Sequence, residues 1–128
     1  MVDTSTATAG VVLFAHGARD PQWAQPFRSI REQVRVLHPD ACVELAFLEL
    51  MAPDLTQCVQ QMIGQGIRHV SVVPLFMAQG GHLKEDLPVM VQRLQAAHPE
   101  VTIHVTPAIG ESPMLLAAIA GWVVQQTR

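Results

Sequence analysis

The sequence predicts an α/β fold, a three-layer α/β/α sandwich built around a four-stranded parallel sheet of strand order 2-1-3-4. Two observations lead to this prediction. Short apolar runs alternate four times with segments of helical spacing, and two of the runs are almost wholly apolar while two contain polar residues. The chain of 128 residues suits one such domain, expected over residues 10–128 behind a flexible tail of residues 1–9.

Four apolar runs are expected to form the strands. Val11–Phe14 is continuously apolar and Val70–Phe76 nearly so, which is typical of central strands covered on both faces. Cys42–Leu48 is interrupted by Glu44, and Val101–Val105 alternates between apolar and polar residues, so both belong at the edges. Right-handed crossover connections between these strands then give the order 2-1-3-4.

Four segments with apolar residues at helical spacing follow these runs. Asp20 is expected to cap the helix at Pro21, and Ser112 is expected to cap the last helix. Asp86 is expected to cap a helix that begins at Pro88, because proline is tolerated in a first turn. The apolar stripes are Phe27, Ile30, Val34 and Leu37; Leu55, Cys58, Val59, Met62 and Ile63; Leu87, Met90, Val91 and Leu94; and Leu115, Ile119, Trp122 and Val123.

Composition argues against several classes of protein. The net charge is −3, so no basic excess indicates nucleic acid or an anionic membrane as a partner. No apolar run reaches the roughly 20 residues of a membrane span, and no signal peptide is visible. Cys42 and Cys58 form no CxxC pair and are expected to be buried free thiols in a reducing compartment. The free thiols and the lack of a visible signal peptide lead us to expect a cytoplasmic location. The sequence also lacks P-loop, GxSxG and HExxH motifs.

Two histidines and a carboxylate follow three neighbouring strands of the predicted sheet. His16 follows the first strand, Glu49 the second and His82 the third. Since ligands of parallel sheets bind at the carboxyl ends of the strands, where the connections reverse direction, we expect these side chains to lie close together. Imidazole is the commonest metal ligand in proteins, and three ligands leave coordination positions open. The sequence therefore predicts an open metal site.

Each of these residues also has an ordinary structural interpretation. A single histidine at a strand end is more often a helix cap or a hydrogen-bonded polar group than a ligand. Glu49 could be a solvated carboxylate at the end of a strand. The presence of both His16 and His82 at the same edge of the sheet, each beside a glycine, favours the functional interpretation.

Three further candidates lie in the loop after the third strand. Gly80 and Gly81 either make a tight turn or let the backbone approach a large flat ligand. Met77 either fills the core or lines a pocket, because a flexible thioether suits both environments. We therefore count all three among the residues that could bind a ligand at this edge.

Three segments resemble the signatures of a known family. VVLFAHGARDP, FLELMAPDL and VPLFMAQGGHLKEDLP are similar to the signatures of the short CbiX-type sirohydrochlorin chelatases, which belong to the class II chelatases. The resemblance covers the chain from Val11 to about Trp122 and implies a chelatase-like half-domain. One departure is Ala18, where the family commonly has a serine whose hydroxyl could contact the substrate or orient His16.

The resemblance implies ATP-independent insertion of Co²⁺ or Fe²⁺, with Ni²⁺ as a third candidate, into sirohydrochlorin. This is a step of cobalamin or siroheme biosynthesis, and it implies no organic cofactor. His16 and His82 would hold the metal ion and accept the pyrrole protons, since imidazole titrates near neutral pH, and Glu49 would accompany them. Arg19 and Lys84 stand within three residues of these histidines and could bind the carboxylates of the substrate.

Two other functions stay open. AHGARD superficially resembles the RHG motif of histidine phosphatases, although Ala15 stands where that motif needs an arginine. A non-catalytic carrier of cobalt or nickel, or a tetrapyrrole-binding protein, could contain the same residues, but the presence of two histidines favours catalysis. The longer members of the family contain two such halves, so a chain of this length is expected to form a homodimer.

Overall fold

Strands and helices alternate along the chain in the computed structural model, which describes residues 9–128 apart from the side chain of His82. The tail expected over residues 1–9 lies outside the described residues, except that Ala9 begins the first strand. The elements in chain order are β1 (Ala9–Ala15), η2 (Pro21–Ala24), α1 (Gln25–Leu37), β2 (Cys42–Phe47), α2 (Leu55–Gly64), β3 (His69–Pro74), α3 (Gly81–Ala97), β4 (Thr102–Val105), η3 (Ile109–Glu111) and α4 (Pro113–Gln126).

The sheet has the predicted strand order, β2-β1-β3-β4, and all three pairings are parallel. In the centre, Val12 of β1 is paired with Glu44 of β2 on one side and with Val72 of β3 on the other. Val12 and Val72 are fully buried, whereas Thr102 and His104 of the edge strand β4 are exposed. The prediction of two central and two edge strands is therefore confirmed.

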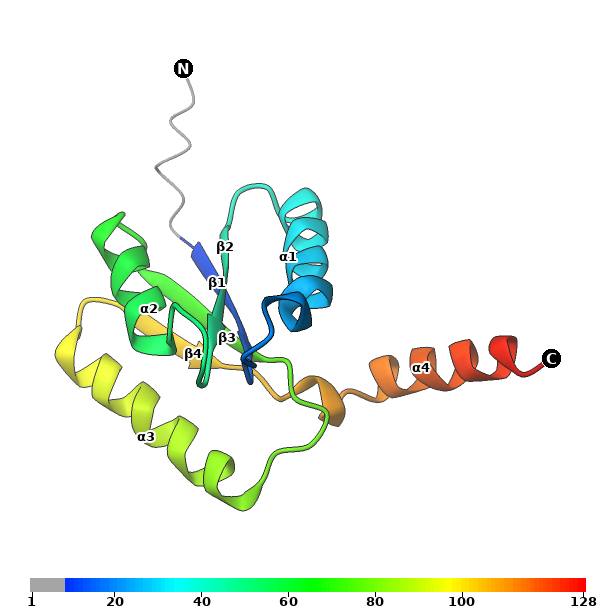
Figure 1. The fold of residues 1–128 in the computed structure, drawn as a ribbon. Helices are drawn as coiled ribbons and strands as arrows, with labels where there is room; N and C mark the ends of the chain where they lie inside the picture. The colour runs from blue at the N-terminus through cyan, green and yellow to red at the C-terminus, as the bar shows by residue number, and fades with distance from the viewer. Residues whose placement is uncertain (1–8) are drawn as a thin grey trace.

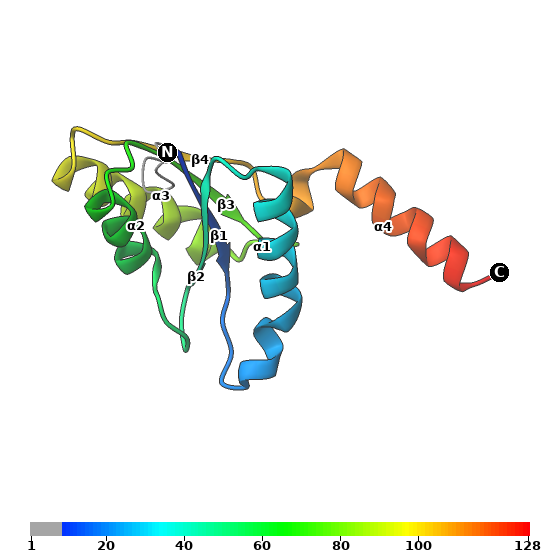
Figure 2. The ribbon, with the colours of Figure 1, turned by 90° about the horizontal axis from the view of Figure 1, so that it is seen from above.

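Helices cover both faces of the sheet, which confirms the layered α/β/α arrangement (Figures 1 and 2). On one face α2 and α3 pack against the sheet, and the core there includes Phe14, Leu55 and Leu87. On the other face α1 lies along β2 and β1, and a smaller core there includes Leu13 and Phe47.

α4 stands outside these layers and extends away from the sheet (Figures 1 and 2). The apolar spacing predicted the helix correctly, and Ser112 caps it as predicted, because its Oγ accepts a hydrogen bond from the Leu115 N–H at 3.3 Å. None of the residues of α4 is buried, however, including its predicted apolar stripe. No helix in the described part of the chain is long and apolar enough to cross a membrane.

α3 begins earlier than the sequence predicted. Gly80 is its N-cap, so the expected cap, Asp86, lies inside the helix, and Pro88 is an interior residue instead of a first-turn residue. The prediction of a helix start at Pro88 is therefore wrong. The helix continues through the proline because Leu83, one turn before Leu87, is buried in the core on the same side of α3.

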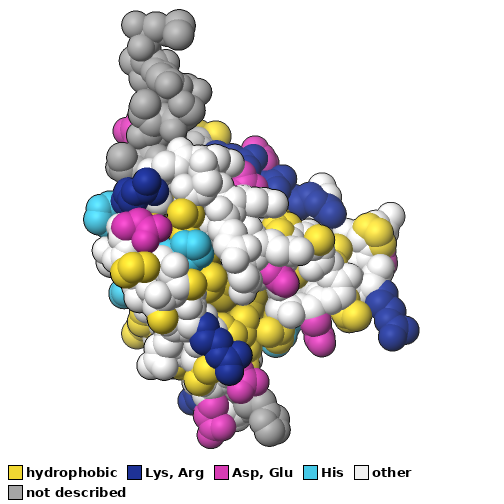
Figure 3. Space-filling model, turned by 90° about the vertical axis from the view of Figure 1, so that its left-hand side faces the viewer, with side chains coloured by type: hydrophobic (Ala, Val, Ile, Leu, Met, Phe, Trp, Pro, Cys, Tyr) yellow, Lys and Arg dark blue, Asp and Glu magenta, His cyan; other side chains and the backbone are white. Residues whose placement is uncertain are grey.

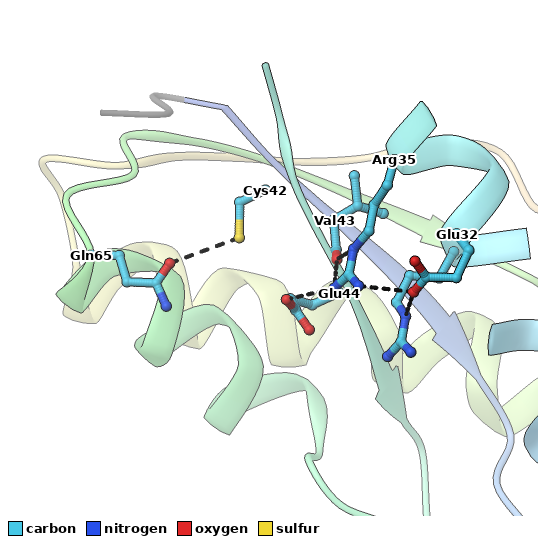
Figure 4. A network of polar contacts seen from close by, with 7 residues as sticks. Glu32, Arg35, Cys42, Val43, Glu44 and Gln65 are labelled. Atoms are coloured by element: carbon cyan, nitrogen blue, oxygen red, sulfur yellow. Dashed lines mark hydrogen bonds and ion pairs between the residues drawn. The ribbon is translucent and has the colours of Figure 1, made fainter. Parts of the chain in front are cut away.

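Arg35 connects α1 to the edge strand β2 (Figure 4). Its guanidinium donates hydrogen bonds to the Val43 carbonyl oxygen at 2.8 and 3.1 Å and forms ion pairs with Glu44 and Glu32, both at 2.9 Å. Glu44, the residue that interrupts the apolar run, therefore has a cationic partner at the edge of the sheet.

Both cysteines are free thiols. Cys58 of α2 is buried, as predicted, and this burial, together with the neighbouring Glu44 and Cys42, raises the pKa of its thiol to about 12. Cys42 is only partly buried, because it is the first residue of the edge strand β2. Burial and Glu44 raise the pKa of Cys42, although Arg35 opposes them. Both thiols therefore stay protonated at neutral pH.

Candidate functional site

His16 is the first residue after β1, at the carboxyl edge of the sheet. Its ring lies against the ring of Phe76, which follows β3, with the ring centroids 4.3 Å apart and the ring planes at 49°. Phe76 is buried and meets Phe14 edge-on, with the centroids 5.6 Å apart. The imidazole therefore packs on an aromatic ring of the core, while His16 as a whole is exposed to solvent.

The loop that follows β1 is bonded to the loop that follows β2. The Leu48 N–H donates a hydrogen bond to the Ala15 carbonyl oxygen at 2.8 Å, and the Glu49 N–H donates one to the His16 carbonyl oxygen at 3.1 Å. The pairing of β1 with β2 thus continues past the ends of the strands. As a result, the backbones of His16 and Glu49 lie side by side, and both residues are exposed.

Gly17 permits this close approach. Its φ of +91° lies in the left-handed region, and a Cβ atom at this position would collide with the carbonyl oxygen of Glu49. The same oxygen accepts a hydrogen bond from the Met51 N–H at 2.8 Å. Sequence reasoning assigned no role to Gly17 or to Phe76. Two features of the sequence could have pointed to them, namely a glycine directly after the candidate histidine and an aromatic residue at the end of the third apolar run.

The loop after β3 presents its two glycines to solvent. Gly80 is the N-cap of α3 and Gly81 is its first residue, and neither has a heavy atom within 4 Å of where a Cβ would be. Nothing in the described structure therefore blocks a ligand from these backbone positions. Met77, earlier in the same loop, is 55% exposed and does not fill the core.

His82 lies in the first turn of α3, and its side chain is outside the described part of the molecule. The described side chains therefore include only two members of the predicted metal site, His16 and Glu49. Among the described side chains, no three His, Cys, Asp or Glu residues are grouped so that they could hold a metal ion.

A groove of about 340 Å³ runs along the N-terminal half of α3. Lys84, Leu87 and Glu111 are among the residues that line it. A smaller hollow of about 230 Å³ adjoins the groove, shares Lys84 and Glu111 with it and reaches Met77. Two of the predicted binding residues, Met77 and Lys84, therefore line the same hollow. Glu111, in the segment after β4, also lines this hollow and was not among the predicted binding residues.

Arg19 is exposed in the loop between His16 and η2. The neighbouring Asp20 caps η2 as predicted, since its carboxylate accepts a hydrogen bond from the Gln22 N–H at 2.9 Å. Arg19 is thus in the loop after β1, and Lys84 is in the first turn of α3, which follows β3; both strands are central. Basic and acidic side chains are interspersed on the face of the molecule drawn in Figure 3. Neither sign of charge therefore dominates this face.

Comparisons with solved structures agree with this architecture. The CbiX family model matches residues 10–125. A cobalamin (vitamin B12) biosynthesis CbiX protein from Marinobacter aquaeolei VT8 has a TM-score of 0.81 and 37% identity, over 93% of this chain and 97% of that chain. The sirohydrochlorin chelatase SirB from Bacillus subtilis subspecies spizizenii, in complex with cobalt, has a TM-score of 0.72 and 26% identity, over 82% of this chain and 45% of that chain.

Curated proteins with similar sequences include two kinds of chelatase. A sirohydrochlorin cobaltochelatase from Methanopyrus kandleri is 37% identical over 81 residues, which are 63% of this chain and 57% of that protein. A sirohydrochlorin ferrochelatase from Bacillus subtilis is 27% identical over 109 residues, which are 85% of this chain and 42% of that protein. The chain thus spans about half the length of these relatives.

Proposed function

The chain belongs to the CbiX family, and on that premise we propose that it inserts Co²⁺ or Fe²⁺ into sirohydrochlorin without ATP. The relatives named as a cobaltochelatase and a ferrochelatase support both metals. The observation that carries the proposal is the place of His16. It is an exposed histidine at the carboxyl edge of the sheet, and its ring lies against a buried phenylalanine.

The chemistry requires a base and a weak metal ligand at the same place. When a divalent ion enters the macrocycle, two pyrrole N–H bonds break and both protons must go to acceptors. A neutral imidazole can hold the ion through a ring nitrogen, and it can take up a proton once that nitrogen is free, so that two imidazoles can accept both protons. We assign these tasks to His16 and His82, with Glu49 as an additional ligand. A ligand set that stays incomplete lets the ion pass on to the macrocycle, whereas a closed four-ligand site would retain it.

The remaining candidates are assigned to the binding of the tetrapyrrole. Arg19 and Lys84 are placed to pair with its peripheral carboxylates, which form charge-assisted hydrogen bonds with cationic side chains. Gly80 and Gly81 leave the backbone open to a flat ring, and the exposed Met77 offers an apolar surface beside them. No organic cofactor enters this scheme, because the metal ion is itself a substrate.

We also infer the setting in which the chain works. Two free thiols that stay protonated at neutral pH fit a reducing compartment, so we place the protein in the cytoplasm. The chain corresponds to about half of SirB, and we therefore expect two copies to form a homodimer.

Metal insertion into the purified ligand tests the proposal. Mixing the protein with sirohydrochlorin and Co²⁺ or Fe²⁺ should change the absorbance of the macrocycle faster than the uncatalysed reaction does. His16→Ala and His82→Ala should each lower the rate about 100-fold, the usual order of effect when a general base is lost. His104→Ala is the matched control, because His104 is exposed on the edge strand β4, and it should keep the wild-type rate.

Four results would count against this proposal. A wild-type rate equal to the uncatalysed rate would exclude turnover, and unchanged rates in both histidine variants would exclude the proposed site. Tight binding of Co²⁺ or Ni²⁺ without insertion would instead indicate a metal carrier, and tight binding of the macrocycle alone would indicate a tetrapyrrole-binding protein.

A further inference from the structure

The backbone of Leu50 adopts a conformation that leucine rarely adopts. Its φ is +66°, and it is the one residue other than glycine with a positive φ in the described part of the chain. The Met51 N–H donates a hydrogen bond to the Glu49 carbonyl oxygen at 2.8 Å, which closes a γ-turn centred on Leu50. In this region the Cβ of an L-residue crowds the backbone, so a leucine is strained here whereas a glycine is not.

Contacts on both sides of Leu50 hold the turn in this conformation. Before the turn, the Glu49 N–H donates a hydrogen bond to the His16 carbonyl oxygen at 3.1 Å. After the turn, Met51 packs against the smaller core, on the α1 side of the sheet. Strain of this kind persists only where the surrounding structure determines the conformation, and strained residues cluster at ligand sites. The turn at Leu50 is therefore a candidate for a ligand contact.

The side chain of Leu50 does not compensate for the strain within the chain. It is 58% exposed, and Leu50 belongs to neither of the two cores of the described chain. Burial in a core is what normally favours a leucine over a less strained residue. An exposed leucine in a left-handed turn therefore points to a contact with a molecule outside the chain.

Leu50 and Met77 stand on either side of His16 along the edge of the sheet. Leu50 follows β2, His16 follows β1 and Met77 follows β3, and these strands are neighbours in this order. The loops after β1 and β2 extend from the same end of the sheet (Figure 2). β2 and β3 are about 10 Å apart, twice the usual strand spacing, which a tetrapyrrole macrocycle can span. The loop of the candidate base thus lies between two loops that each expose an apolar side chain.

We propose that Leu50 contacts the face of the tetrapyrrole macrocycle and so favours a flat, conjugated ligand. A ring of this kind has apolar faces and carboxylates at its periphery, so its recognition needs apolar side chains as well as cations. Arg19 and Lys84 are assigned to the periphery, and Leu50 adds an apolar contact beside His16, opposite Met77. This inference rests on the proposed function and specifies which part of the substrate the loop after β2 recognises.

Binding of metal-free sirohydrochlorin to variants of Leu50 tests this contact. Leu50→Asn removes the apolar side chain, and the variant should fold, because asparagine adopts the left-handed region more readily than leucine. Its Kd for the macrocycle should be about tenfold higher than that of the wild type, since burial of a leucine side chain contributes at least this factor. The KM for sirohydrochlorin should rise with it. Leu50→Met keeps an apolar side chain and should keep a Kd close to that of the wild type.

Leu37→Asn is the matched control. Leu37 is the last residue of α1 and is 84% exposed. Because α1 connects two parallel strands, it runs back along the sheet, and its last turn lies at the end opposite to the loop after β1 (Figure 2). The same exchange at Leu37 should leave the Kd unchanged. Urea unfolding should show that Leu50→Asn is at least as stable as the wild type, because asparagine relieves the backbone strain.

The insertion assay and the binding assay together separate the possible outcomes. If the wild type inserts the metal ion and Leu50→Asn has an unchanged Kd, the proposal is overturned and the proposed function stands. If the wild type binds the macrocycle without inserting metal and Leu50→Asn weakens binding, the contact is supported and the chelatase activity is not. A wild type that neither binds nor inserts would overturn both.

Two further results would also contradict the contact. An equal rise in Kd in Leu50→Met would mean that the shape of the turn matters and not an apolar contact. A clear loss of stability in Leu50→Asn would mean that the leucine stabilises the fold itself.

Discussion

The imidazole of His16 lies against the ring of Phe76, with the ring centroids 4.3 Å apart. His16 follows β1 and Phe76 follows β3, so this contact joins the ends of the two central strands. Phe76 is 1% exposed and can move little in a close-packed core. The orientation of the candidate base is therefore coupled to the packing of the core.

Replacing Phe76 should impair insertion more than it impairs folding. Phe76→Leu keeps an apolar side chain but removes the ring that supports His16. We expect kcat to fall about tenfold with little change in KM, and the free energy of unfolding to fall by about 1–2 kcal/mol. The matched control is Phe14→Leu, which removes a ring equally buried in the same core. Equal loss of kcat in both variants would mean that Phe76 has only a structural role.

Gly17 should be far less tolerant of substitution than Gly66. Both have a φ near +90°, but only at Gly17 would a Cβ collide with another part of the backbone, the carbonyl oxygen of Glu49. Gly66→Ala should cost about 1 kcal/mol for the backbone conformation alone. Gly17→Ala should cost about 2 kcal/mol more, because the two loops must separate. Urea unfolding measures both values, and equal costs would show that the loops are not held together.

The two cationic candidates should affect substrate affinity and not turnover. Arg19→Gln and Lys84→Gln should each raise the KM for sirohydrochlorin several-fold and leave kcat unchanged, since each removes an ion pair with a carboxylate. Added salt should raise the wild-type KM in the same direction, because it screens exposed charges. Arg93→Gln, on an exposed part of α3, is the control. A KM that rises equally in Arg93→Gln would indicate a general effect of net charge.

The thiol of Cys58 should resist modification in the folded protein. Burial raises its pKa to about 12, so it is almost wholly protonated at pH 8, and the thiolate is the reactive form. In a Cys42→Ala chain, a thiol reagent should label Cys58 only after urea unfolds the protein. Rapid labelling of the folded chain would mean that α2 opens readily.

Stability should fall in alkaline solution because of the same thiol. The pKa of Cys58 is about 12 in the folded chain against 9.0 for a free thiol. Above pH 9 the unfolded state therefore loses this proton while the folded state keeps it, and the free energy of unfolding decreases as pH rises. The chain has no tyrosine, which removes one other group that titrates in this range.

Urea unfolding between pH 8 and 11 measures this decrease. Cys42→Ala should lose the part of the slope that comes from the raised pKa of Cys42. The double variant Cys42→Ala with Cys58→Ala should have a still smaller slope, although it is less stable at every pH. An identical slope in the two variants would assign the alkaline loss to other groups.

The sheet could be predicted because its order depends on which runs are buried. Val11–Phe14 and Val70–Phe76 have almost only apolar residues, and a run of that kind is stable only with both faces covered. The start of α3 could not be predicted in the same way. Gly80 is its N-cap and Gly81 is its first residue, and the burial of Leu83 in the core stabilises this turn in spite of the low helix propensity of glycine.

The sequence by itself determined the strands, their order and the loops that carry His16 and Glu49, because apolar periodicity and the hand of crossover connections follow from the chain itself. The loop that the sequence predicted around His82 is instead the first turn of α3. Only the tertiary structure decided that Phe76 supports His16 and that Gly17 admits the carbonyl of Glu49. It also decided that α4 leaves the body of its own chain. Such contacts join residues far apart in the sequence, and they depend on distances and on space that no local pattern specifies.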